Sequence, residues 1–164
     1  MVATKQLPTR SAVPEELTWD LTPIYADQAA YEADIAQVKA AIPTVTALKE
    51  TFTSSADTVL AGIQAVLALY RRLEKVAVYA SLKSDQDTGN STNAALDDQA
   101  SSLTAKVSAA TAWFEPAILE LTPGELDTYL DENVDLRDYR HLLDTIRLQK
   151  GHVRNSPDGL LGHN

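Results

Sequence analysis

The fold is decided by residues 57–84, which read DTVLAGIQAVLALYRRLEKVAVYASLKS. Apolar residues recur in this stretch at alternating spacings of four and three residues, the heptad pattern of a helix that buries one narrow seam. A long helix is therefore expected to follow Asp57 and to reach the polar turn at residues 85–90. Its predicted seam consists of Val59, Ile63, Val66, Tyr70, Leu73, Ala77 and Ala80.

A second helix with the same heptad spacing of apolar residues is predicted after the polar turn Asp85-Gln86-Asp87-Thr88-Gly89-Asn90. The turn carries a glycine suited to a helix C-cap and side chains typical of turns. Two heptad helices joined by a short turn make an antiparallel helical hairpin. The seam of the second arm is predicted at Leu96, Ala100, Leu103, Val107, Ala110 and Phe114, and Pro116 is expected to kink or end that arm.

Before the hairpin, Pro8, Pro14 and Pro23 exclude a continuous helix over residues 1–25. We expect an extended N-terminal arm there. Within it, the stretch from Trp19 to Thr22 is expected to be held against the rest of the fold by one aromatic side chain. A first helix is predicted after Asp27 as its cap, to be stopped by Pro43. Its inward-facing residues are Tyr31, Ile35, Val38 and Ile42, and Ser54-Ser55-Ala56-Asp57 reads as a capping box for the hairpin.

Two shorter helices are predicted after the hairpin. Thr122-Pro123-Gly124-Glu125 combines a cap, a proline at the first helical position and an acid at the third. Asp135 is predicted to cap the last helix, which Gly151 ends. The chain is thus predicted to be all-α: an extended arm (1–25), a helical domain (26–151) and a frayed tail (152–164). The inward-facing residues of these helices are Leu126, Tyr129 and Leu130, then Leu136, Tyr139, Leu143 and Ile146.

The composition limits the classes of function. The 164 residues include 14 basic and 23 acidic ones, a net charge of −9, which disfavours binding to nucleic acid or to anionic membranes. With 45% hydrophobic residues and no apolar run of membrane-spanning length, a folded, soluble chain is expected. Cysteine is absent, and the start lacks the apolar core of a secretory signal, so the default location is cytoplasmic.

No side-chain pattern in the chain predicts an active site. His141, His152 and His163 are eleven residues apart, and no pair has the spacing of a helical zinc site. The run Asp85–Gly89 fails the calcium-loop pattern, because the twelfth position of that loop would be Leu96 instead of a glutamate. We therefore assign no catalytic, cofactor-binding or metal-binding residue, and the residues alone support only an acidic all-α hairpin domain.

Several stretches, in this order and at this spacing, resemble the N-terminal part of the oligoendopeptidase F family. These enzymes are thimet-oligopeptidase-like zinc peptidases. The resemblance covers about residues 7–155, nearly the whole chain. It is carried by Leu7-Pro8-Thr9-Arg10-Ser11, by the run from Pro14 to Tyr25 that contains Leu17-Thr18-Trp19-Asp20-Leu21-Thr22-Pro23, by Tyr79 to Asn90, by Ser108 to Pro116 with Trp113-Phe114-Glu115, and by Tyr139-Arg140-His141 with Asp144.

The resemblance implies the N-terminal helical region of a much larger zinc metalloendopeptidase that hydrolyses short peptides. In that family a later, C-terminal catalytic domain carries His-Glu-x-x-His and a further glutamate ligand. Zinc there would polarise the scissile carbonyl and activate water. The N-terminal region would supply part of the wall of the substrate cleft. None of those catalytic residues occurs here, so zinc is expected only in the full-length enzyme and this chain is expected to be inactive alone.

Beyond Lys150 the family's continuation, a proline and a Ser-Pro-acidic helix start, is lost. We therefore expect a chain truncated before the catalytic domain. Its expected partners are that missing C-terminal domain and, in the full-length enzyme, an oligopeptide substrate. The alternative is a stand-alone helical-hairpin interaction module that pairs through its heptad face. Self-association through exposed apolar helix faces stays open under both hypotheses.

Overall fold

The computed structural model describes residues 10–153, with the side chains of that range except Ser11 and residues 149–153. The predicted all-α class is confirmed, since no residue in this range lies in a strand. Short 3₁₀ turns connect the helices. The helices are α1 (Gln28–Ala47), α2 (Ala56–Gln86), α3 (Ser91–Thr111), α4 (Phe114–Glu120), α5 (Pro123–Glu132) and α6 (Arg140–Val153).

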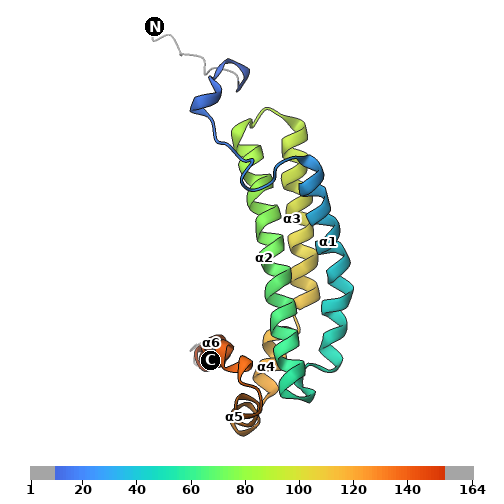
Figure 1. Ribbon diagram of the computed structural model, residues 1–164, viewed down its shortest axis with the longest axis vertical. Coiled ribbons are helices and arrows are strands. Elements are labelled where there is room, and N and C mark those ends of the chain that lie inside the picture. Colours follow the sequence, from blue (N-terminus) through green and yellow to red (C-terminus); the bar gives the residue numbers. More distant parts are fainter. Residues whose placement is uncertain (1–9, 154–164) are drawn as a thin grey trace, which may run out of the picture. The chain divides into compact units, whose positions relative to one another are not determined.

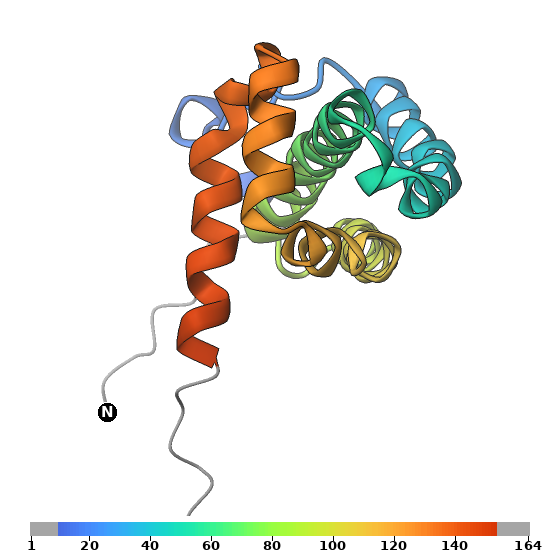
Figure 2. The same ribbon diagram turned by 90° about the horizontal axis from the view of Figure 1, so that it is seen from below.

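The chain divides into two compact units. Within the described range, unit 1 consists of residues 10–42 and 69–107, and unit 2 of residues 43–68 and 108–153. In unit 1, the parts of α1, α2 and α3 that belong to it lie side by side (Figure 1). In unit 2, α4 packs against α6, and α5 lies next to α6 (Figure 2). Helices α1, α2 and α3 each contribute residues to both units.

The predicted helical hairpin is confirmed as α2, a four-residue turn and α3. The turn ends at Asn90, whose side-chain oxygen accepts hydrogen bonds from the backbone N–H of Thr92 (2.9 Å) and Asn93 (3.2 Å). The side chain of Asn93 donates to the carbonyl of Lys83 at 2.9 Å, which ties the first turn of α3 to the last turns of α2. The expected left-handed glycine cap is wrong, because no described glycine has a positive φ.

The predicted seam of α2 is confirmed at five of its seven positions and wrong at two of them. Tyr70 is 40% exposed and Ala77 is half-buried, whereas Leu69 and Val76 are buried in their place. A heptad seam assumes one neighbouring helix. In unit 1, however, α2 has α3 on one side and α1 with the N-terminal arm on another. A helix with neighbours on two sides buries a wider face than a heptad stripe.

Pro43 does not stop the first helix, because α1 continues through it to Ala47. A proline inside a helix costs about 3 kcal/mol, since it removes one hydrogen-bond donor and crowds the preceding turn. The extra turn buries Val45, and burying a valine is worth about 1.5–3 kcal/mol. The gain from Val45 is comparable to the cost of Pro43, so the helix ends one turn later than predicted.

Two predicted helix starts are displaced. The cap of α2 is Ser55, whose hydroxyl accepts from the N–H of Thr58 at 3.2 Å, while the Thr58 hydroxyl accepts from the N–H of Ser55 at 2.9 Å. The predicted acid, Asp57, instead accepts a hydrogen bond from the Asn133 side chain at 2.7 Å. Because Ser54 and Ser55 are adjacent and both suit a cap, the sequence alone could not separate them.

Toward the last helix, Asn133 rather than Asp135 acts as the cap. Its side-chain oxygen accepts from the N–H groups of Asp135 (3.0 Å) and Leu136 (3.2 Å), and a 3₁₀ turn over Asp135–Tyr139 leads into α6. Gly151 does not end α6, which extends to Val153. Of the predicted frayed tail, residues 154–164 lie outside the described residues, as do residues 1–9 of the predicted arm.

Two proline-based predictions are confirmed. The second arm of the hairpin ends at Thr111, and Pro116 lies in the first turn of α4. Its ring would crowd residue 112, four positions back, where the helix is already broken. At the next helix start, Thr122 and Glu125 form the predicted capping box, with mutual hydrogen bonds of 2.8 and 3.2 Å.

An aromatic cluster forms the core of unit 2. Phe52 is 1% exposed, and its ring centroid lies 5.2 Å from that of Trp113 and 5.6 Å from that of Phe114. The Cδ2 and Cε2 atoms of the Phe52 ring lie against Gly62 of α2. A Cβ atom added to Gly62 would stand 2.4 Å from the ring, so only glycine leaves room for it.

Candidate functional site

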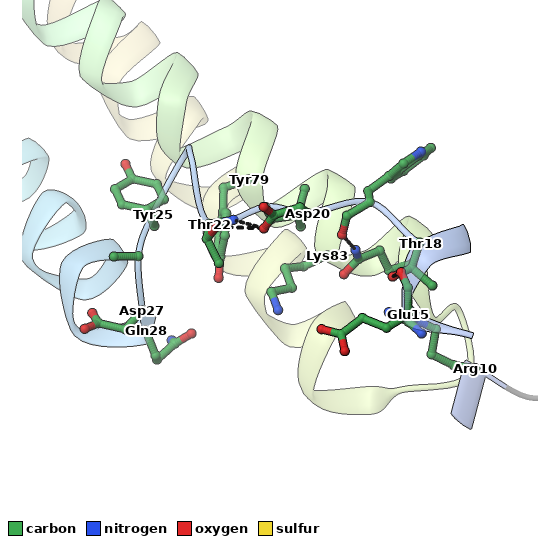
Figure 3. A pocket seen from close by; sticks show the side chains of 14 residues that line it. Arg10, Glu15, Thr18, Asp20, Thr22, Tyr25, Asp27, Gln28, Tyr79 and Lys83 are labelled. Carbon is green, nitrogen blue, oxygen red and sulfur yellow. Dashed lines mark hydrogen bonds between the residues drawn. The ribbon is translucent and has the colours of Figure 1, made fainter. Parts of the chain in front are cut away.

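A polar pocket in unit 1 is the candidate site (Figure 3). Its volume is about 390 Å³, and it lies between the N-terminal arm and the last turns of α2. The arm and the start of α1 contribute eleven residues between Arg10 and Gln28, and α2 contributes Tyr79, Lys83 and Gln86. A volume of this size suits a small ligand.

Two residues of the arm are the buried anchors, and neither is the predicted one. Leu21 and Tyr25 are buried, whereas Trp19 is 58% exposed. The stretch around Trp19 is instead held by its backbone, since the side chain of Gln86 donates to the Trp19 carbonyl at 2.6 Å. Apolar character alone predicted Trp19 as the anchor; the backbone contact to α2 could not be foreseen from it.

Tyr25 joins the arm to both α1 and α2. Its hydroxyl donates a hydrogen bond of 2.8 Å to Asp34 of α1. Its ring makes edge-on contacts with Tyr31 (5.5 Å between centroids) and Tyr79 (5.1 Å). The Lys75 ammonium lies 4.0 Å from the centre of the same ring, a cation–π contact. The wall of the pocket is therefore fixed by several side chains at once.

Asp34 carries the charge that balances this cluster. Its carboxylate lies 3.7 Å from the Arg72 guanidinium and 3.6 Å from the Lys75 ammonium, both on α2. Because two cations and one phenol share a single acid, Asp34 remains paired when any one of these partners is removed.

The environment of the tyrosines raises their pKa values. For Tyr25 the main cause is burial, and the hydrogen bond to Asp34 and the charge of Asp34 raise the pKa further. Burial also raises the pKa of Tyr31 and of Tyr79. All three phenols are thus held in the neutral form, and their ionisation opposes the folded state.

Replacing Tyr25 by phenylalanine is expected to lower the free energy of unfolding at neutral pH by about 1 kcal/mol, the net worth of one hydrogen bond. A raised pKa stabilises the fold below the unfolded-state pKa of about 10, and this stability is lost as the pH rises further. Unfolding free energy should therefore fall above about pH 10. The fall should be shallower in Tyr25→Phe, by up to about 1.4 kcal/mol per pH unit. Denaturant titrations at several pH values above 10 measure how steeply the unfolding free energy falls with pH in the parent and in Tyr25→Phe. Equal slopes would show that ionisation of Tyr25 does not oppose folding.

Of the three histidines, only His141 has a described side chain. His141 is exposed on α6, while the side chain of His152 and the whole of His163 lie outside what is described. Among the described side chains, no three His, Cys, Asp or Glu residues are close enough to hold a metal ion. The described part of the chain therefore does not fit the zinc of the resembled family. No helix within residues 10–153 has the length and apolar character needed to cross a membrane.

The pocket cannot be predicted from the sequence alone, because its parts are distant in the chain. Tyr79 and Lys83 belong to the predicted long helix and to the stretch that carries the family resemblance, and Asp27 is predicted as a cap; none of them is predicted as a pocket residue. The useful signal was their position: Lys83 lies four residues after Tyr79, so both project from one face of α2. Asp27 and Glu15 reach the same pocket only because the arm packs against that face of α2.

Comparison with known proteins gives consistent matches. No family model matches the chain. It is 34% identical over 144 residues to the group B oligopeptidase PepB of Streptococcus agalactiae, covering 88% of this chain and 24% of that protein. It is 33% identical over 156 residues to the oligopeptidase PepF of Bacillus subtilis, covering 95% of this chain and 23% of that protein. The chain thus spans about a quarter of the length of these curated relatives.

A solved structure agrees with the sequence matches. The crystal structure of oligoendopeptidase-F from Enterococcus faecium matches 71% of this chain and 22% of its own, at 39% identity and a TM-score of 0.67. The similarity therefore extends to the arrangement of the helices as well as to the sequence.

Proposed function

The chain is homologous to the N-terminal region of oligoendopeptidase F peptidases, and on this premise we propose that it serves as the N-terminal helical domain of a zinc metalloendopeptidase acting on short peptides. In this role it forms part of the wall of the substrate cleft, and it is inactive alone. The catalytic zinc and its ligands belong to a C-terminal domain of the same polypeptide, and the enzyme works in the cytoplasm.

The observation that carries the proposal is the match to an oligopeptidase over 88% of the chain but only 24% of the relative. A chain that aligns along almost its whole length with one quarter of an enzyme corresponds to one region of it. A scaffolding role is supported by polar side chains that serve the fold: Asn90 and Thr122 cap helices, and Gln86 fastens the arm to α2.

The alternative of an interaction module that pairs through its heptad face has less support. Of the predicted seam residues of α2, Val59, Ile63, Val66, Leu73 and Ala80 are buried within the chain's own fold. A seam that already forms the core is not available to a partner.

The proposal is tested by exchange with a relative. A chimera in which this chain replaces the matching region of the Enterococcus faecium oligoendopeptidase-F should cleave quenched fluorescent peptides, and the same enzyme lacking that region should not. The isolated chain should show no cleavage and no stoichiometric zinc by elemental analysis. A folded but inactive chimera, or chelator-sensitive cleavage by the chain alone, would refute the proposal.

A further inference from the structure

The pocket of unit 1 contains polar groups that the fold itself does not use. The first is the hydroxyl of Tyr79. Its residue is only 4% exposed and lines the pocket, yet no hydrogen bond joins this hydroxyl to any residue from 10 to 153 (Figure 3). The hydroxyl itself is open to solvent through the pocket, so it can donate a hydrogen bond to a molecule bound there.

The second group is the ammonium of Lys83. It lies 5.8 Å from the centre of the Tyr79 ring and lines the same pocket. Within the described part of the chain, no carboxylate is paired with it. Tyr79 and Lys83 therefore present a neutral donor and a cation to the same space. These are the groups that bind a carboxylate.

Acidic groups line other parts of the pocket. Asp27 caps α1 with one oxygen, which accepts from the N–H of Ala30 at 2.8 Å, and its second oxygen has no described partner. The carboxylate of Glu15 likewise makes no described hydrogen bond or ion pair. Asp20 accepts from the N–H and the hydroxyl of Thr22, at 2.9 and 2.7 Å, and both hydrogen bonds go to one of its two oxygens. The charge of Asp27 reaches Tyr79, since it raises the pKa of that phenol.

We propose that this pocket binds a small zwitterion with a free ammonium and a free carboxylate, the chemistry of amino acids and of very short peptides. The carboxylate lies between the Lys83 ammonium and the Tyr79 hydroxyl, and the ammonium faces Asp27. The lining holds two cations, Arg10 and Lys83, as well as the acids, so a ligand that carries both charges matches more of it than a simple anion or a simple cation. The inference rests on the pocket and does not depend on the proposed function.

The test is a titration of the isotopically labelled full chain with alanyl-alanine, followed by NMR. The chain contains two tryptophans, and each gives a separate indole N–H signal. Trp19 lines the pocket and reports binding, whereas Trp113 belongs to unit 2 and serves as the internal control. The Trp19 signal should shift and saturate at millimolar peptide, while the Trp113 signal stays in place. Alanine in place of the dipeptide distinguishes an amino-acid site from a peptide site.

Variants and blocked ligands separate binding from structure. Lys83→Met should raise the dissociation constant about tenfold, the loss of one charge-assisted hydrogen bond, and Tyr79→Phe should raise it several-fold. Lys49→Met, at an exposed lysine of unit 2, is the matched control and should bind normally. Acetyl-alanyl-alanine and alanyl-alanine amide, which each lack one charge, should bind more weakly than the free dipeptide.

Three outcomes would overturn the proposal. The first is a Trp19 signal that does not move with alanine or with the dipeptide. The second is equal binding of the acetylated peptide, which would show a plain anion site. The third is a Lys83→Met variant with altered unfolding free energy but unchanged affinity, which would show that Lys83 serves only the end of α2.

Discussion

Replacing Phe114 by alanine is expected to lower the free energy of unfolding by about 3–5 kcal/mol. The ring is 7% exposed and lies 5.6 Å from the Phe52 ring and 5.9 Å from the Trp113 ring, centre to centre. Its removal takes away buried apolar area and leaves a cavity that two rigid rings cannot close. Denaturant unfolding followed by Trp113 fluorescence, with Trp19 replaced by phenylalanine, measures the effect in unit 2.

The matched control for Phe114→Ala is Leu148→Ala on α6. Leu148 is among the exposed large hydrophobic residues, so its truncation should change stability by less than about 0.5 kcal/mol. A loss below about 1 kcal/mol for Phe114→Ala would mean that the aromatic cluster does not hold unit 2 together.

Replacing Gly62 by alanine is expected to destabilise the protein by about 2 kcal/mol, although alanine is the better helix former. Helix propensity alone predicts a gain of about 1 kcal/mol. The new methyl group, however, would stand 2.4 Å from the Phe52 ring, and that ring is itself confined by Trp113 and Phe114. Overpacking of a confined core costs about 1–3 kcal/mol, and a contact this short lies at or above the upper end of that range. Chemical denaturation shows directly whether Gly62→Ala lowers or raises the free energy of unfolding.

A double-mutant cycle identifies the cause. Phe52→Leu shortens the side chain that faces Gly62, so adding Gly62→Ala in that background should cost less than in the parent. Ala61→Gly, at the adjacent exposed position of α2, tests propensity alone and should cost about 1 kcal/mol. A stabilising Gly62→Ala would show that the Phe52 ring does not lie against α2.

The helical hairpin could be predicted from the sequence because its signals are local. Apolar spacing predicted the two long arms, Asn90 lies at the start of the second one, and Pro116 lies in the first turn of the helix that follows it. These features depend on residues within one or two turns of each other. The structure that these local signals predict therefore does not depend on how the rest of the chain packs.

The errors arose where distant residues decide the local structure. Tyr70 follows the heptad spacing, but the buried face of α2 shifts to Leu69 because a second neighbour covers that side. Pro43 should have ended α1, but the burial of Val45 extends it. The pocket could not be predicted for the same reason, since Glu15 and Asp27 meet Lys83 only after the arm has packed on α2.

The hydrogen bond between Gln86 and the Trp19 carbonyl spans 67 residues, and this has a consequence during translation. The arm is synthesised before α2. Among the segments that the arm contacts, the end of α2 is synthesised last. At about 5–20 residues per second, the arm waits about 3–13 s for its partner. Throughout that interval Tyr25 has only its partners on α1, Tyr31 and Asp34, and its contacts with Lys75 and Tyr79 form only when α2 has been made.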